Sequence, residues 1–426
     1  MKYLKNPFAK EVLEKCNSYQ SNVEMFRAIF KENFFYIANT IDPNIKDIVE
    51  AMINCQSYSN GYTIYQCPSC GEYKSVPFTC KTRFCPSCGN IINMKRANSI
   101  AEKMFNVSHR HGVFTCPEEL DPYFFYDRSL LHVMAEAATD AIKIVINDVS
   151  PKRNPLPGVI YVIHTFSRSS EWNPHIHCIF TVGGITKYGK WFPLLGDHVS
   201  YEKLRKTYQD LLLKKMRRKI GPSFLSLEDK LRKKYTNGFY VHAPRVAETL
   251  KGSPKKLIKY LARYLGRPCI ASSRIDGYDG KNVYFHYTPH NDSKDENTST
   301  QEKVLYEKLD AIDFMIRLID HIPEQNFQMI GYCGIYANAS IDRVTKAMQT
   351  GEVDYLYSRS SHTKRVEATH WRQAMMRAFN VDPLECPVCL DTMVPLYAKY
   401  KGRRYSVELG KKRKTRGKSK RTKNRR

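Results

Sequence analysis

The sequence predicts an α+β fold in which helices flank an antiparallel sheet. Strand-like runs alternate with helical stretches between residues 110 and 287, and two of the runs flank a short polar turn, as in a β-hairpin. Hydrophobic residues make up 42% of the 426-residue chain, which is enough for a sizeable core. At this length we expect two or three domains.

Hydrophobic spacing gives the order of the elements. Residues 1–54 show apolar side chains at helical spacing and form a helical lead-in. Residues 55–100 are cysteine-rich and ribbon-like, with a short strand at 62–65, and residues 101–288 form the main α+β domain. Its expected strands are 112–115, 159–166, 175–182, 239–242 and 283–287, and its expected helices are 129–149, 202–219 and 254–265.

The C-terminal third divides into three parts. Residues 289–302 are polar and acidic and are predicted to be a linker or insertion. Residues 303–400 are predicted to be mostly helical, with a loop at 331–338. Residues 401–426 form a basic tail too poor in apolar residues to fold.

The charge indicates a polyanionic partner. The formal net charge is +26, and Lys411–Arg426, which includes Lys411, Lys412 and Arg413, contributes 11 basic residues out of 16. The rest of the chain still carries +15, and binding to phosphates releases condensed counterions, so nucleic acid is the favoured partner. No apolar run approaches the ~18–20 residues of a membrane span, and no secretory signal is found, so we expect no membrane partner and a cytoplasmic, nucleoid-associated protein.

Two C-x-x-C pairs predict a structural zinc site. Cys67-Pro-Ser-Cys70 and Cys85-Pro-Ser-Cys88 are each followed by glycine, and 14 residues separate them. Four thiolates suffice for a closed tetrahedral Zn²⁺ site. Arg83 and its basic neighbours then either contact a DNA backbone or form a solvated basic face.

The other clustered cysteines leave alternatives open. Cys55 and Cys80 either belong to a second zinc site or pack as small hydrophobic residues. Cys386 and Cys389 either complete a zinc site with residues distant in the chain or form a packed pair.

A histidine pair on a predicted strand suggests a divalent-metal site. His175 and His177 flank Ile176, and alternate residues of a strand point to one face. Neutral imidazoles placed side by side can bind a metal ion. His109 and His111 share this spacing, but a charged residue lies between them and no clear strand surrounds them, so we do not expect a metal site there.

A tyrosine pair on a predicted helix suggests a nucleophile. Tyr260 and Tyr264 lie four residues apart on the helix 254–265 and therefore share one face. A phenol with a pKa near 10 needs a metal ion or basic groups to attack phosphorus. Such pairs are also common in cores; the basic neighbours here are Lys259, Arg263 and Arg267.

These motifs together resemble the two-tyrosine HUH rolling-circle transposases of the IS-ninety-one type. The resemblance covers most of the chain. It rests on C-P-S-C-G…C-K-T-R-F-C-P-S-C-G, V-F-T-C-P at 113–117, W-N-P-H-I-H at 172–177, G-G at 183–184, Y-L-A-R-Y-L-G-R-P at 260–268, H-I-P…G-I-Y from 321 to 336 and D-P-L-E-C-P-V-C at 382–389.

The resemblance implies a Rep-like antiparallel sheet and a mechanism. His175 and His177 would bind Mg²⁺ or Mn²⁺, with His164 on the preceding strand as a third ligand. Tyr260 would attack single-stranded DNA at a transposon end and form a 5′-phosphotyrosine, and Tyr264 would serve a second transfer step. Alternatives are a plasmid replication initiator or relaxase with the same chemistry, and a non-enzymatic zinc-ribbon protein that binds DNA.

Overall fold

The chain folds into two compact units, each assembled from segments far apart in sequence. The computed structural model describes residue 8 and residues 19–194, 200–243, 268–289, 304–356, 372–373, 375–376 and 382–406. Met1–Ile53 and Lys81–Arg365 form the first unit, and Asn54–Cys80 and Val366–Arg426 form the second. The cysteine-rich stretch expected as one ribbon over 55–100 therefore contributes to both units.

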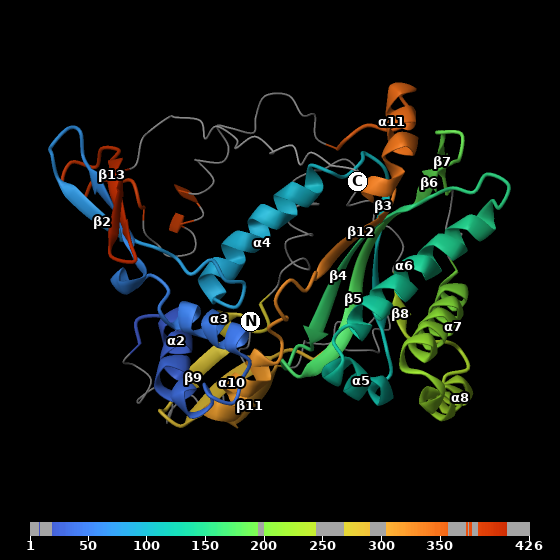
Figure 1. Ribbon diagram of the computed structural model, residues 1–426, viewed down its shortest axis with the longest axis horizontal. Coiled ribbons are helices and arrows are strands. Elements are labelled where there is room, and N and C mark those ends of the chain that lie inside the picture. Colours follow the sequence, from blue (N-terminus) through green and yellow to red (C-terminus); the bar gives the residue numbers. More distant parts are fainter. Residues whose placement is uncertain are drawn as a thin grey trace, which may run out of the picture. The chain divides into compact units, whose positions relative to one another are not determined.

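A five-stranded antiparallel sheet is the centre of the first unit (Figure 1). Its strand order is β12-β4-β5-β3-β8, so consecutive β4 and β5 form a hairpin and the other strands join from distant positions. The backbone of Ser167 donates a hydrogen bond to the carbonyl oxygen of Glu171, which closes the hairpin turn. The strands are β3 His109–Thr115, β4 Gly158–Phe166, β5 Trp172–Thr181, β8 Val241–His242 and β12 Ile330–Gly334.

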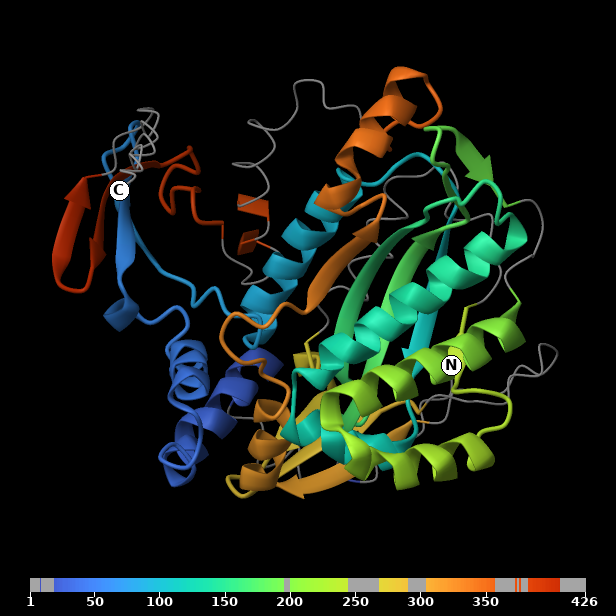
Figure 2. The ribbon, with the colours of Figure 1, turned by 45° about the vertical axis from the view of Figure 1, so that its right-hand side comes forward.

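One face of this sheet carries the main hydrophobic core. Ile163 and Ile176 alternate with the histidines along β4 and β5 and are fully buried against α6 (Leu130–Val149) and α7 (Tyr201–Ile220), which cross this face in Figure 2. Burying such a side chain contributes about 1.5–3 kcal/mol, so this alternation fixes which face points outward. Ser200 caps α7 by accepting a hydrogen bond from the backbone of Lys203.

The described residues cover only part of the opposite face. Helix α4 (Pro86–Ala101) packs Ala97 and Ile100 against Ile160 and Val162 at one end of this face. The histidines occupy the other end of the same face, because His164 pairs with His175 and Val162 pairs with His177 across β4 and β5.

A smaller layer in the first unit pairs N-terminal helices with a three-stranded antiparallel sheet. Helices α2 (Asn22–Asn33) and α3 (Pro43–Ile53) lie in the stretch expected as a helical lead-in. The side chain of Asn33 donates to the Tyr278 hydroxyl at 2.7 Å and links α2 to the sheet. The sheet has the order β11-β10-β9 and consists of β9 Ile275–Tyr278, β10 Asn282–Tyr287 and β11 Leu305–Asp310. Helix α10 (Ala311–Ile319) directly follows β11.

The remaining described elements of the first unit are short. A two-stranded ribbon pairs β6 (Gly183–Ile185) with β7 (Trp191–Pro193). Three helices complete the described part: α5 Asp121–Tyr126, α8 Leu225–Lys234 and α11 Ile341–Gln349. No described helix has the length and apolar character needed to cross a membrane.

The second unit contains a four-stranded antiparallel sheet of order β14-β13-β1-β2. Its N-terminal hairpin consists of β1 (Tyr62–Gln66) and β2 (Tyr73–Pro77), and its C-terminal hairpin consists of β13 (Val394–Tyr400) and β14 (Arg403–Ser406). Pairing of β1 with β13 joins the hairpins into one sheet.

The predicted α+β class is confirmed, but three expectations for the C-terminal part differ from the structure. The expected loop at 331–338 begins with β12, whose five residues include Gly331 and Gly334 and therefore have low strand propensity; pairing with β4 supplies the stabilisation. The described part of 303–400 contains β11, β12 and β13, so it is mixed rather than mostly helical, and residues 403–406, assigned to the tail, form β14.

Candidate active site and metal centres

Three histidines converge on the partly covered face of the five-stranded sheet. His164 comes from β4 and His175 and His177 from β5, and one ligand nitrogen from each lies within 4.8 Å of the others. The register causes this convergence, since His164 is directly opposite His175 and antiparallel partners point to the same face. We call these three residues the histidine group.

The surroundings of the histidine group favour its metal-binding form. The Nδ1–H of His175 donates to the carbonyl oxygen of Asn173 at 2.8 Å, so its Nε2 carries the lone pair. Burial lowers the pKa of His175, which keeps the imidazole neutral near pH 7. A neutral imidazole held by a carbonyl is the usual arrangement of a metal-ligating histidine.

A fourth histidine, His111, contacts this group. Its Nε2 lies 3.0 Å from Nδ1 of His177, and the two rings stack 5.2 Å apart at 12°. Burial, with His242 and His175 nearby, lowers the pKa of His111 to about 4. Residues 109–111 also lie in a strand, since β3 begins at His109, so the expectation that no clear strand surrounds them is wrong.

Arg110 explains this error. The charged side chain argued against a strand, yet it is buried, donates to the carbonyl oxygen of Ala243 and lies over the ring of Tyr201. A signal was present in the sequence, since His111, Val113 and Thr115 share the period of two that places His175 and His177 on one face.

The expected nucleophile lies outside the described residues. This applies to Tyr260 and Tyr264 and to the basic residues Lys259, Arg263 and Arg267, together with Lys411, Lys412 and Arg413. Their positions relative to the histidine group are therefore not part of the geometry.

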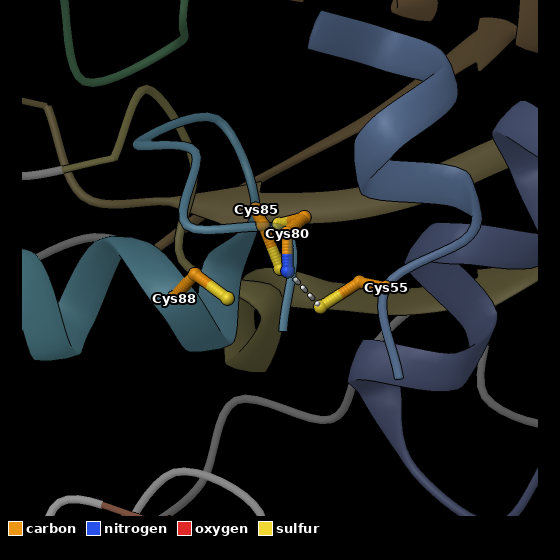
Figure 3. A group of neighbouring side chains, drawn as sticks. All are labelled: Cys55, Cys80, Cys85 and Cys88. Atoms are coloured by element: carbon orange, nitrogen blue, oxygen red, sulfur yellow. Dashed lines mark hydrogen bonds between the residues drawn. The ribbon is translucent and has the colours of Figure 1, made fainter. Parts of the chain in front are cut away.

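The first of two cysteine groups contains Cys55, Cys80, Cys85 and Cys88, whose sulfurs all lie within 4.8 Å of one another. Figure 3 shows these side chains approaching from the end of α3, the segment before Lys81 and the start of α4. The backbone N–H of Cys80 donates to the sulfur of Cys55 at 3.4 Å. Cys85 is the N-cap of α4 and Pro86 its first residue, so the helix N-terminus favours thiolates here.

The second cysteine group contains Cys67, Cys70, Cys386 and Cys389, again with all sulfurs within 4.8 Å. The single site expected from Cys67, Cys70, Cys85 and Cys88 is therefore wrong in its pairing. The first C-x-x-C pair is the turn of the β1–β2 hairpin and the second begins a helix, and each is completed by other cysteines. The geometry supports the alternatives in which these other cysteines belong to metal-binding groups, Cys55 and Cys80 in the first and Cys386 and Cys389 in the second.

Arg83 lines a cavity of about 330 Å³ in the first unit, together with Arg96, Ile330 and Tyr332 among others. Burial and the neighbouring Arg96 lower the pKa of Arg83 to about 10. Ile330 pairs with Val162, which pairs with His177, so the register places this cavity on the same face of the sheet as the histidine group.

Comparison with known proteins gives the family. Residues 24–116 match the family described as "Transposase zinc-binding domain", and residues 158–346 match the family described as "Putative transposase". The chain is 28% identical over 371 residues to the transposase for insertion sequence element IS801 of Pseudomonas savastanoi pv. phaseolicola, covering 82% of each protein. It is 22% identical over 303 residues to "Putative transposase y4qJ" of Sinorhizobium fredii, covering 68% of this chain and 74% of the relative. No solved structure matches.

These matches agree with the geometry of the site. The zinc-binding match spans six clustered cysteines, and this agreement supports structural Zn²⁺. The second match begins at β4 and contains the whole histidine group. The chain therefore belongs to the transposases of the IS-ninety-one type and carries an N-terminal zinc-binding domain.

Proposed function

We propose that this transposase cuts and rejoins single-stranded DNA at transposon ends through a metal-assisted tyrosine nucleophile. The observation that carries the proposal is the histidine group, in which three imidazoles from paired strands bring their ligand nitrogens within 4.8 Å on a partly covered face. His175 and His177 are half-buried and therefore reachable by a phosphodiester, whereas His164 is buried and anchors the group.

The donor set fits a divalent metal ion. Three neutral nitrogen donors suit Mn²⁺ better than Mg²⁺, which prefers oxygen ligands, and positions left open accept phosphate oxygens. A bound ion would polarise the scissile phosphodiester and favour the phenolate form of an adjacent tyrosine. We assign the metal to His164, His175 and His177.

Tyr260 is the proposed nucleophile and Tyr264 the acceptor in the second step. The Tyr260 oxygen forms a bond to phosphorus as the bond from phosphorus to the 3′ oxygen breaks, which leaves a 5′-phosphotyrosine and a free 3′-hydroxyl. Attack by a 3′-hydroxyl on that linkage rejoins DNA and restores the phenol. A spacing of four residues on one helix would present both phenols to the same metal ion.

The proposed DNA path uses basic residues of the first unit and the tail. Arg83 and Arg96 line one cavity on the face that carries the histidine group, and a phosphate between the two guanidinium groups would relieve their repulsion. Lys259, Arg263 and Arg267 would contact phosphates near the nucleophile, and the tail with Lys411, Lys412 and Arg413 would add affinity independent of sequence. A protein that acts on DNA in this way would work in the cytoplasm, at the nucleoid.

The alternative functions are not favoured. Both relatives carry transposase names rather than names of replication initiators or relaxases. A non-enzymatic zinc-ribbon protein would not need three histidines with converging ligand atoms.

The test is a covalent-adduct assay on labelled single-stranded oligonucleotides that carry the element ends. With Mn²⁺ or Mg²⁺ the protein should form an adduct that survives a denaturing gel. Tyr260→Phe should abolish it, and His175→Ala and His177→Ala should lose cleavage while still binding DNA. Tyr264→Phe is the matched control and should retain the first adduct. Full adduct yield from Tyr260→Phe, or from both histidine variants, would refute the mechanism.

A further inference from the structure

The C-terminal pair Cys386 and Cys389 lies beyond both family matches, which end at residues 116 and 346. In the second unit this pair lies against Cys67 and Cys70, more than 300 residues earlier. The sulfurs of Cys67 and Cys389 are 3.4 Å apart, and those of Cys70 and Cys386 are 3.5 Å apart.

These distances match metal coordination rather than a disulfide. A disulfide needs sulfurs about 2.05 Å apart. Four sulfurs at ~2.3 Å from a tetrahedral Zn²⁺ lie about 3.8 Å from one another, which is close to the spacing found here. The four sulfur atoms also all lie within 4.8 Å of one another, as the ligands of one ion must.

The two C-x-x-C turns share one backbone geometry. Gly71 N–H donates to the Cys67 carbonyl oxygen at 2.9 Å, and Leu390 N–H donates to the Cys386 carbonyl oxygen at 3.1 Å. The N–H groups of Cys67 and Cys386 donate in turn to carbonyl oxygens five residues later. Gly71 has φ +77° and Leu390 has φ +63°, so the second turn holds a leucine in the left-handed region where the first has glycine. Such strain persists where the surrounding structure requires it.

Among the described residues, the hydrophobic core around these turns is small. Its buried residues are Tyr65, Cys67, Val76, Cys386 and Met393, two of which are the cysteines themselves. Units with so small a core depend on a metal ion or disulfide for stability. Polar links between the two segments exist, since the ammonium group of Lys74 donates to the carbonyl oxygens of Asp382 and Glu385 at 2.6 and 2.9 Å.

We propose that Cys67, Cys70, Cys386 and Cys389 bind a second structural Zn²⁺, which closes a zinc ribbon made from two segments at opposite ends of the sequence. The turn of the β1–β2 hairpin contributes one C-x-x-C pair, and the turn that precedes β13 contributes the other. The ion would fasten these two segments together. Binding requires thiolates, so uptake of the ion releases protons. The proposal is independent of the tyrosine mechanism.

The test is the zinc content of the full-length protein and of matched cysteine variants. We expect two Zn²⁺ per chain in the natural protein and one in Cys386→Ser/Cys389→Ser. Cys67→Ser/Cys70→Ser should also hold one, and the combined fourfold variant should still hold one, because all four residues serve the same ion. Cys116→Ser/Cys333→Ser, with cysteines outside both groups, is the control and should keep two.

Either of two results would overturn the proposal. One is full zinc content in Cys386→Ser/Cys389→Ser, which is the outcome expected if Cys67 and Cys70 share an ion with Cys85 and Cys88. The second uses a variant that keeps four ligands, Cys386→His, in Co²⁺-substituted protein. Replacing one thiolate by imidazole should shift the visible d–d bands of one of the two ions, and an unchanged spectrum would show that Cys386 is not a ligand.

Discussion

Removing the imidazole of His111 should weaken metal binding at the histidine group without removing a ligand. The Nε2 of His111 lies 3.0 Å from Nδ1 of His177, so Nδ1–H of His177 can donate to it and present Nε2 to the metal ion. In His111→Ala this restraint on the ring orientation and tautomer of His177 is lost.

The size of the effect follows from the kind of contact. A neutral hydrogen bond contributes about 0.5–1.5 kcal/mol, and the loss of a partner that orients a metal ligand costs about 10–100-fold in metal affinity. Tenfold corresponds to about 1.4 kcal/mol. Since both imidazoles are half-buried, we expect His111→Ala to lie near the lower end of this range, with about tenfold weaker Mn²⁺ affinity.

The assay is a titration of zinc-loaded protein with Mn²⁺, with free ion measured by electron paramagnetic resonance and no DNA present. His111→Gln should recover most of the affinity, because its amide oxygen can accept the same hydrogen bond. His132→Ala is the control, since His132 lies on α6, the helix that packs against the opposite face. Mn²⁺ affinity of His111→Ala within twofold of the natural protein would refute the positioning role.

Three further changes test charge, protonation and packing. Arg83→Gln should weaken single-stranded DNA binding and reduce the slope of log affinity against log salt by ~0.7, and an unchanged slope in filter binding would exclude a phosphate contact. Burial and nearby Glu118 raise the pKa of Asp121 to about 7, so the free energy of unfolding should fall as pH rises from about 4 to about 7. Asp121→Asn should remove about 1–2 kcal/mol of this change, a value reduced for the partial exposure of the carboxyl group. Identical urea midpoints across this pH range for both proteins would contradict the prediction. A Cβ on Gly331 would overlap the ring of Tyr161, so Gly331→Ala should destabilise by about 1–3 kcal/mol in urea unfolding, and equal stability would show that the ring can move aside.

Strong local patterns made much of the sheet that carries the histidine group predictable. The β4–β5 hairpin combines alternating apolar residues with a polar turn, and this period of two also places His175 and His177 on one face. His164 was predicted from its phase on the preceding strand, and the structure brings it into the group. Where a single residue broke the local pattern, prediction failed, as with Arg110 in β3 and the glycines of β12, because partners supplied by the fold offset their low propensity.

The cysteines show what spacing alone does not determine. Two C-x-x-C pairs 14 residues apart have the ligand types and the spacing that a single zinc site needs. Each pair, however, lies in a tight turn, and the strand or helix next to that turn sets the direction of its sulfurs. Cys67 and Cys70 turn a hairpin that pairs through β1 with β13, whereas Cys85 and Cys88 begin α4. The pairing of β1 with β13 and the position at which α4 begins therefore determine which cysteines each pair joins. A substitution of Cys386 should perturb the site that contains Cys67 rather than cysteines closer to Cys386 in the sequence.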